Sequence, residues 1–157
     1  MSRRDQIRMS DEEVLAFLGE ERTVICATNG RRGWPHLMPL WYVLRPTGDG
    51  GATQLWAWTF ARSQKARNLE RDPRATLQVE AGETYDQLRG VMLECDVVVH
   101  RDVERIRDLG LELYERYGGV TDDVRAMIDK QAPKRIALQF VERGRATWDH
   151  RKLGGSW

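Results

Sequence analysis

The sequence lacks the features that would place it outside the cell or in a membrane. Its two cysteines, Cys26 and Cys95, lie within predicted strands and form no CxxC pair, so free core thiols are expected rather than a disulfide framework. It has no long uncharged apolar run, and its charged start, Met1 to Asp5, lacks the apolar core of a secretory signal. We therefore expect a cytoplasmic protein that does not enter a membrane.

Signatures of common catalytic and metal sites are also missing. The sequence contains no HExxH, GxSxG or GxxxxGK(S/T) motif. Its three histidines, His36, His100 and His150, are scattered along the chain, so no metal site is expected. The formal net charge of +1 argues against a nucleic-acid-binding field spread over the whole surface.

What the sequence does contain is the pattern of one mainly β domain. Its 157 residues, 41% of them hydrophobic and 31% charged, are enough to bury one core. The clearest strand lies at 91–100, where Val91, Leu93 and Cys95 fall on one face and charged residues on the other. Alternation and turn signals predict six strands in all, over residues 23–28, 34–44, 53–60, 75–80, 91–100 and 135–141.

Helices are predicted between and around these strands. One begins after Ser10, one after Ser63, and two more lie at 103–117 and 121–131. Because most strands are joined by short turns, we expect a six-stranded antiparallel split barrel, a mainly β fold with flanking α-helices. It is predicted to be a single domain over residues 1–157, with an N-terminal helix and a C-terminal tail.

The segment from Thr59 to Asn68 joins a strand end to a helix start. Ser63 is the expected N-cap, and Asp72-Pro73 ends the helix. A helix N-terminus carries unpaired N–H groups and a partial positive charge, and Lys65 and Asn68 lie on one face at i, i+3. This arrangement suits a phosphate group. An ordinary capped helix with a solvated cationic face fits the same residues equally well.

The segment 34–44 is unusual because it is apolar on both faces. One face must fill the barrel. The other, which by alternation carries Leu37, Pro39, Trp41 and Val43, needs a second partner. Pro39 removes a ladder N–H and therefore predicts a strand edge or a bulge. The expected partner is a flat ring system, another subunit or both, and packing under the flanking helices is the alternative.

In this order and spacing, the two segments carry a family resemblance. The runs are GWPHLMPLWY at 33–42, RSQKARNL at 62–69 and DPR at 72–74. They resemble the split β-barrel superfamily of pyridoxamine-phosphate-oxidase-like flavoproteins. The runs YDQLRGV at 85–91 and WDHRKLG at 148–154 are similar to the actinobacterial branch that uses the deazaflavin coenzyme F420. The resemblance extends from Ser10 to Gly155, and the tail run is its most specific part.

The resemblance implies a homodimer with two cofactor sites at the subunit interface. It implies that the cofactor phosphate lies on Ser63, Gln64 and Lys65, with Asn68 close by. It implies that the cofactor ring lies against four residues of the second strand, Pro39, Leu40, Trp41 and Tyr42. It also implies that two residues of the third strand, Trp58 and Thr59, line the same cleft.

The resemblance also suggests how the cofactor is recognised beyond its phosphate. The tail residues His150, Arg151 and Lys152 are expected to come from the neighbouring subunit. Coenzyme F420 continues into several glutamates, which flavin mononucleotide lacks, and these carboxylates need cations. We expect the tail cations to meet them, together with the arginines around the phosphate-binding helix, Arg62, Arg67 and Arg71.

The implied activity is that of an oxidoreductase. It would pass a hydride between reduced coenzyme F420 and an unsaturated small molecule. A flavin-mononucleotide oxidase or reductase on the same fold, and a coenzyme F420-binding protein without turnover, remain alternatives. The cofactor carries the hydride chemistry, and no residue is assigned as a proton donor, Tyr42 and His36 being candidates by residue type only.

Overall fold

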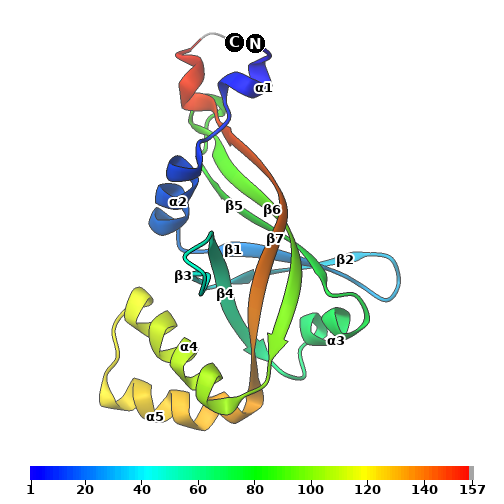
Figure 1. Cartoon of the computed structure of the whole chain (residues 1–157), viewed down its shortest axis with the longest axis vertical. Helices are drawn as coiled ribbons and strands as arrows, with labels where there is room; N and C mark the ends of the chain where they lie inside the picture. The colour runs from blue at the N-terminus through cyan, green and yellow to red at the C-terminus, as the bar shows by residue number, and fades with distance from the viewer. Residues whose placement is uncertain (156–157) are drawn as a thin grey trace.

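An antiparallel sheet forms the centre of the protein (Figure 1). In the computed structural model, which describes residues 1–155, its seven strands are β1 (Val24–Asn29), β2 (Pro35–Leu40), β3 (Val43–Pro46), β4 (Thr53–Phe60), β5 (Arg74–Ala81), β6 (Arg89–His100) and β7 (Arg135–Asp149). Their order across the sheet is β2-β1-β5-β6-β7-β4-β3. The predicted mainly β fold with flanking helices is confirmed.

The sheet curls until its two edges are joined by a very short connection. Strands β2 and β3 stand at opposite ends of the strand order, yet only Trp41 and Tyr42 separate them in the chain. Because a residue spans at most about 3.6 Å, the last residue of β2 and the first of β3 must lie within roughly 11 Å of each other. The sheet is therefore an open barrel that a two-residue junction holds together.

This junction corrects one prediction. The expected single strand at 34–44 is two strands, so the barrel has seven strands instead of six. Tyr42 and Val43 are both buried, whereas Trp41 is 46% exposed. Tyr42 packs in the inner core, whereas Val43 packs against helix α4 (Val103–Tyr117) on the outer face. Trp41 stacks on Tyr117 of the same helix, so Trp41 and Val43 share a face as the alternation predicted, and this part of the face packs under a flanking helix. The strand is interrupted where the Tyr42 N–H donates to the Tyr117 hydroxyl and the Tyr42 carbonyl accepts from Arg116.

For two other strands, the predicted bounds can be compared with the observed ones. The predicted bounds 53–60 are those of β4. By contrast, β7 continues to Asp149, well beyond the predicted end at 141. Its second half pairs with β6 as far as Arg89↔Asp149, past a bulge at Glu94/Cys95. The first two residues of the predicted tail motif, Trp148 and Asp149, are thus strand residues.

The core lies on the inner face of the barrel. Every second residue of β1, β5 and β6 is buried there, and α2 (Asp11–Glu20) adds Phe17 and Leu18. Ser10 caps α2 with the predicted capping box. Cys26 and Cys95 are free and buried in this core, and burial raises the pKa of each thiol to about 12. Both thiols are therefore protonated and inert at neutral pH.

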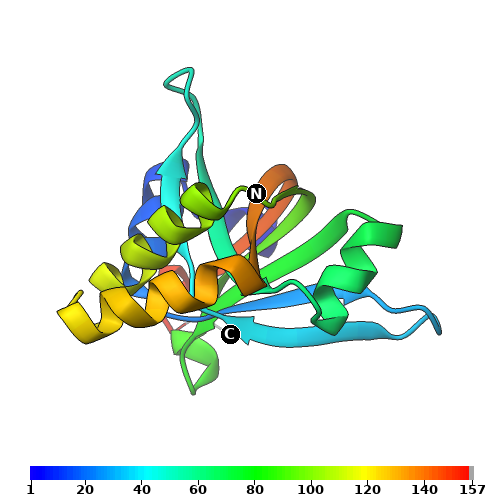
Figure 2. The same cartoon turned by 90° about the horizontal axis from the view of Figure 1, so that it is seen from below.

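The remaining helices lie on the outside and at the ends of the barrel. Figure 2 shows α4 (Val103–Tyr117) and α5 (Asp122–Gln131) on one side and α3 (Gln64–Arg71) on the other. Helix α4 buries Ile106, Leu109 and Leu113 against Val43 and Ala137 of the sheet. Helix α3 contacts β1 and β4. No helix within residues 1–155 is long and apolar enough to cross a membrane.

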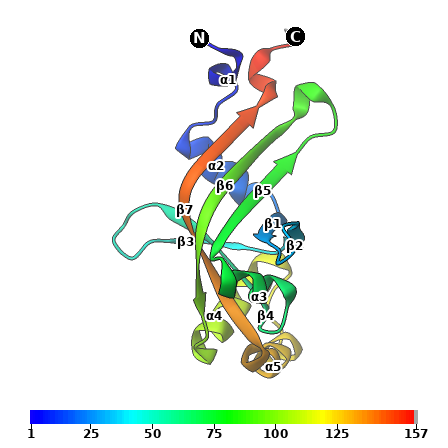
Figure 3. The ribbon, with the colours of Figure 1, turned by 90° about the vertical axis from the view of Figure 1, so that its right-hand side faces the viewer.

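Two short elements near the ends of the described chain lie at one end of the molecule. Short helix α1 (Arg3–Gln6) and the 3₁₀ turn η3 (His150–Leu153) lie together there, far from α3, as Figures 1 and 3 both show. The N–H of Asp149 donates to Ile7 O at 2.7 Å, and the N–H of His150 donates to Leu88 O at 2.9 Å. The predicted tail is therefore an ordered part of the domain. Two further 3₁₀ turns are η1 (Tyr85–Gln87) and η2 (Ala132–Lys134).

Candidate functional site

Helix α3 begins as the sequence predicts. Ser63 has an extended backbone, and its Oγ accepts a hydrogen bond from the N–H of Ala66 at 3.1 Å, so it is the N-cap. The helix ends at Asp72, directly before Pro73. The first turn of α3 is therefore anchored directly after β4.

A cluster of buried polar side chains surrounds this helix start. We call Thr28, Thr59, Lys65 and Asn68 the polar cluster, and all four are buried. Asn68 Nδ2 donates to Thr28 Oγ1 at 3.0 Å, which ties α3 to β1. Gln64 Nε2 donates to Asn68 Oδ1 at 2.8 Å, on the same helix. The structure thus brings Thr59, Ser63, Gln64, Lys65 and Asn68 together, as the sequence analysis expected.

Lys65 is buried in the first turn of α3. Its side chain is only 4% exposed and points toward the barrel interior, which excludes a solvated position for this cation. Its Nζ donates to Thr59 Oγ1 at a long 3.4 Å, and within residues 1–155 it has no carboxylate partner. Burial lowers the pKa of Lys65, because desolvation disfavours the charged form. An ammonium group with so few partners is one that an entering anion would stabilise.

A cationic cleft adjoins the polar cluster. A pocket of about 460 Å³ lies between the β1–β2 turn and α3, and its charged walls are Arg31, Arg32, Arg67 and Arg71. We call it the arginine cleft. Gln64 and Asn68 line it too, so it opens directly onto the polar cluster. None of its four guanidinium groups pairs with a carboxylate in the described part of the chain, whereas arginines such as Arg45, Arg74 and Arg145 do.

The cleft also contains an unsatisfied polar atom. Nδ1 of His36, on β2, is buried and has no hydrogen-bond partner among residues 1–155. His36 lines the cleft opposite α3, and Trp34 at its mouth is 74% exposed. A buried ring nitrogen without a partner fits a ligand-binding site, because such atoms are otherwise satisfied.

Sequence reasoning missed part of this cleft. The sequence pattern assigned no role to Arg31 and Arg32, and it named His36 only by residue type. The available signal in the sequence was a pair of arginines in a tight turn, together with Arg67 and Arg71 four residues apart on the predicted helix. The turn between the first two strands was predictable, but the sequence could not give the packing of α3 against β1 that brings this turn beside the helix.

The four residues of the second strand that were expected to contact the cofactor ring have different environments. Pro39 and Trp41 are exposed and Leu40 is half-buried, so these three remain available to a ligand. Tyr42 is completely buried, and its hydroxyl donates to Leu18 O at 2.6 Å and lies 3.1 Å from Glu21 O. Its side chain therefore cannot contact a bound ring. This corrects the prediction for Tyr42, both as a ring contact and as a candidate proton donor.

Trp58 and Thr59 do not line one cleft with their side chains. They are neighbours on β4, so their side chains point to opposite faces of the sheet. Thr59 faces inward beside Lys65. Trp58 faces outward, where its indole packs against α4 at Gly110. The expectation of a shared cleft is therefore corrected, and only Thr59 belongs to the polar cluster.

The three tail residues lie at the far end of the same chain. Arg151 forms a two-pronged ion pair with Asp149, with Nη2 at 2.6 Å from Oδ2, and Lys152 Nζ lies 2.7 Å from Glu13 Oε2. His150 Nδ1 lies 2.8 Å from Tyr85 O. Within one chain these residues do not reach α3, so a place for them at the cofactor site requires a second copy of the chain.

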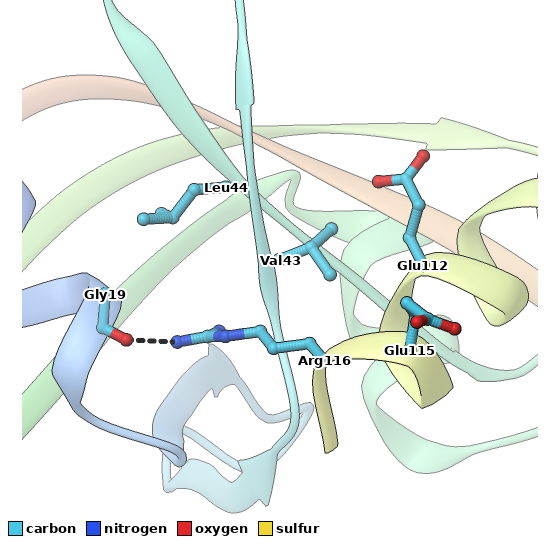
Figure 4. Close-up of a pocket in the computed structure, with 6 residues that line it drawn as sticks. All are labelled: Gly19, Val43, Leu44, Glu112, Glu115 and Arg116. Carbon is cyan, nitrogen blue, oxygen red and sulfur yellow. Dashed lines mark hydrogen bonds between the residues drawn. The ribbon is translucent and has the colours of Figure 1, made fainter. Parts of the chain in front are cut away.

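A different pocket, shown in Figure 4, is structural in character. It has a volume of about 450 Å³ and lies between the end of α2, β3 and α4. The guanidinium of Arg116 points across it to Gly19 O at 3.3 Å, and the same group donates to Leu18 O and Glu21 O. Arg116 thus satisfies the carbonyl groups at the C-terminus of α2. In the arginine cleft, by contrast, only Arg71 among the four arginines donates to protein groups within residues 1–155, namely Arg67 O, Asn29 O and Asn68 Oδ1.

Comparisons with known proteins agree with this architecture. The family model described as Pyridoxamine 5'-phosphate oxidase matches residues 10–148. The crystal structure of the conserved hypothetical protein Rv2991 from Mycobacterium tuberculosis is similar, with 41% identity and a TM-score of 0.85 over 98% of this chain and 93% of that chain. No curated protein matches the sequence.

Two more distant structures share the fold alone. An F420 reductase has 17% identity and a TM-score of 0.65 over 83% of this chain and 94% of that chain. The heme storage protein HutZ from Vibrio cholerae has 18% identity and a TM-score of 0.65 over 87% of this chain and 93% of that chain. The fold therefore serves proteins with different cofactors, and the choice between them depends on the residues of the site.

Proposed function

Since the chain belongs to the pyridoxamine 5'-phosphate oxidase family, we propose that it is an oxidoreductase dependent on coenzyme F420. It would pass a hydride between this deazaflavin and an unsaturated small molecule. The observation that supports the proposal best is the arginine cleft beside the polar cluster, because four arginines without a carboxylate partner in the described chain gather there directly next to buried hydrogen-bonding groups. When bound, the cofactor supplies the hydride chemistry.

The residues of the polar cluster fit a phosphate group. Ser63 Oγ, Gln64 and Asn68 offer hydrogen-bond partners at the start of α3, where the helix dipole favours an anion. Lys65 lies beside them with a cation that lacks a counter-ion. Thr59 holds Lys65 from the opposite side. On this proposal Pro39, Leu40 and Trp41 meet the ring, because they follow His36 of the cleft along the same strand.

The arginine cleft favours coenzyme F420 over flavin mononucleotide. The two cofactors share a tricyclic ring and a phosphate on a ribityl chain, so the polar cluster alone would not separate them. They differ beyond the phosphate, where coenzyme F420 carries carboxylates. Guanidinium groups suit carboxylates because they offer paired donors in one plane. We assign the glutamates to Arg31, Arg32, Arg67 and Arg71, and His150, Arg151 and Lys152 contribute only if a second subunit presents them.

We also propose that the protein is a homodimer in the cytoplasm. Strand β2 is an edge of the sheet, and Leu37 and Met38 are 56% and 44% exposed on it. An exposed apolar edge strand needs a cover, and a second copy of the chain provides one that also borders the site. The free buried cysteines fit a reducing compartment.

On this proposal the protein's residues position the cofactor and the acceptor and shield them from water, and they do not supply the proton. Tyr42 donates its hydroxyl within the core, and the polar cluster is buried, so neither presents an acid to an acceptor. Hydride transfer needs a fixed distance and the exclusion of water. We therefore expect the proton that completes a reduction to come from solvent.

The test is a titration of the purified protein with both cofactors. We expect coenzyme F420 to bind at least ten-fold more tightly than flavin mononucleotide at low salt, and the difference to shrink as salt screens the carboxylates. Oxidation of reduced coenzyme F420 by a panel of unsaturated acceptors then separates an enzyme from a binding protein. Equal affinity at low salt would favour the flavin-mononucleotide enzyme. Tight binding with no faster oxidation by any acceptor would favour the non-catalytic protein.

A further inference from the structure

Arg135 is placed unlike most arginines of this protein. It stands opposite Phe60 in the β4–β7 pairing, so both side chains lie on the outer face of the sheet. Its guanidinium carbon lies 4.0 Å from the ring centre of Phe60 and 4.2 Å from that of Trp58. The guanidinium is thus stacked against two aromatic rings.

The charge of Arg135 is not neutralised. Its Nε and Nη2 both donate to one neutral acceptor, Gln131 Oε1, at 2.9 and 2.6 Å. Within residues 1–155 no carboxylate pairs with it, and Nη1 has no partner. Partial burial lowers the pKa of Arg135, since desolvation opposes the charged form. An arginine that is desolvated, oriented and unpaired fits the recognition of an anion.

An aromatic surface continues from Arg135 along α4. We call Phe60, Trp58, Tyr114 and Trp41 the aromatic belt. The ring of Tyr114 meets those of Trp58 and Trp41 edge-on, with centres 6.5 and 5.8 Å apart. Trp41 in turn stacks on Tyr117 at 4.5 Å. Tyr114 therefore links Trp58 to Trp41, and the guanidinium of Arg135 links Trp58 to Phe60.

The belt is rigid in the middle and open at its ends. A Cβ atom at Gly110 would lie 2.6 Å from the Trp58 ring, so the backbone of α4 rests directly on the indole. At the two ends, Phe60 is 49% exposed and Trp41 is 46% exposed. Preformed aromatic surfaces bind flat, conjugated molecules with little loss of conformational entropy.

The position of the belt links it to the proposed cofactor site. The N–H of Ala61, two residues before the N-cap Ser63, donates to Lys134 O at 2.9 Å, directly before Arg135. The belt therefore begins beside the start of α3. It ends at Trp41, which also belongs to the segment assigned to the cofactor ring.

We infer that Arg135 and the aromatic belt form the acceptor site, and that the acceptor is a planar, conjugated molecule bearing a carboxylate. The rings hold the conjugated system, and the guanidinium holds the carboxylate. The catalytic part of this inference rests on the proposed function. In that reaction the carbon–carbon double bond takes a hydride from the reduced cofactor and a proton from water, and the carboxylate is unchanged.

The test uses trans-cinnamate as the probe, because it has a ring, a conjugated double bond and a carboxylate. Binding to the ligand-free protein is followed by tryptophan fluorescence. Cinnamyl alcohol is the neutral comparison. We expect cinnamate to bind wild type at least ten-fold more tightly than the alcohol, and Arg135→Gln to remove that difference. Arg135→Lys should retain only part of it, because it keeps the charge without the planar fork.

Controls separate recognition from folding and from the proposed function. Arg125→Gln, an exposed arginine of α5 away from the belt, should leave cinnamate affinity unchanged. Coenzyme F420 affinity should also be unchanged in Arg135→Gln. If cinnamate binds through Arg135 but coenzyme F420 does not bind, the acceptor site stands and the proposed cofactor is wrong.

Two results would overturn the inference. One is equal binding of cinnamate by wild type and Arg135→Gln while coenzyme F420 binds normally. The other is the conversion of a dimer to a monomer by Arg135→Gln, with no cinnamate binding by the wild type. In that case the belt is covered by a second copy of the chain and takes no acceptor.

Discussion

The ammonium nitrogen of Lys65 lies 3.4 Å from Thr59 Oγ1, on the inner side of the barrel wall. This is its only hydrogen bond within residues 1–155, and the ammonium is held in the interior without a counter-ion. A buried lysine without a counter-ion costs stability in the ligand-free protein, so folding alone does not explain its role.

We predict that Lys65→Met stabilises the ligand-free protein and weakens cofactor binding. The folded-state pKa of Lys65 is lowered from 10.5 by burial, so the cost of its charge is fully present below that folded pKa and disappears above about pH 10.5. The gain in melting temperature should be about 2–4 °C at neutral pH, which corresponds to roughly 1 kcal/mol, and should shrink as the pH rises toward 10.5.

The same variant should lose ten-fold or more in coenzyme F420 affinity, or about 1.4 kcal/mol. Lys130→Met, on the exposed side of α5, is the matched control and should change neither quantity. Thermal unfolding between pH 7 and pH 10 and a binding titration measure both. If the variant is more stable but binds coenzyme F420 with unchanged affinity, Lys65 has no role in cofactor binding.

We predict that the β1–β2 turn, and not the tail, supplies most of the cofactor preference. Arg31→Gln with Arg32→Gln should reduce the preference for coenzyme F420 over flavin mononucleotide about ten-fold, because these guanidinium groups are unpaired. Arg151→Gln with Lys152→Gln should reduce it less, since Asp149 and Glu13 already neutralise those cations. Titrations in low salt compare the two double variants. A larger effect from the tail pair would mean that a second subunit delivers it to the site.

We predict that Tyr42→Phe affects stability and leaves cofactor affinity within two-fold. The hydroxyl donates to Leu18 O, but Arg116 Nη2 also donates to this carbonyl, at 3.0 Å. The acceptor is therefore not orphaned, and the loss should be about 0.5–1.5 kcal/mol. Trp41→Leu, one residue earlier but exposed, should weaken coenzyme F420 binding with little change in melting temperature. A drop in affinity for Tyr42→Phe would show that the junction rearranges on binding.

We predict a dimer that depends on β2. Sedimentation of wild type at micromolar concentration should give twice the chain mass. Leu37→Asp places a charge on the exposed edge strand and should shift the protein toward monomer, because an unpaired charge in an apolar interface is costly. Leu15→Asp, on an exposed position of α2, should leave the dimer intact. A wild-type protein that sediments as a monomer would refute both the interface and any shared site.

Local chemistry made much of the architecture readable from the sequence. Ser10 and Ser63 cap helices where the pattern placed them, because a capping side chain acts within three residues of the chain. The alternation in β4 and β6 gave the correct strands, since a half-buried strand repeats every two residues. The grouping of Ser63, Gln64, Lys65 and Asn68 likewise followed from helical spacing.

Long-range pairing decided what the sequence could not. The break at Trp41 and Tyr42 arises because both sheet edges meet there, and no local pattern records which strands become edges. The inward direction of the Lys65 side chain and the distance from α3 to η3 depend on how the barrel closes, whereas the opposite faces of Trp58 and Thr59 follow from strand alternation alone. The arginine cleft is the clearest case. Its arginines come from a turn and a helix more than thirty residues apart, and only the packing of α3 against β1 brings their charges together, because like charges do not assemble without a fold that holds them.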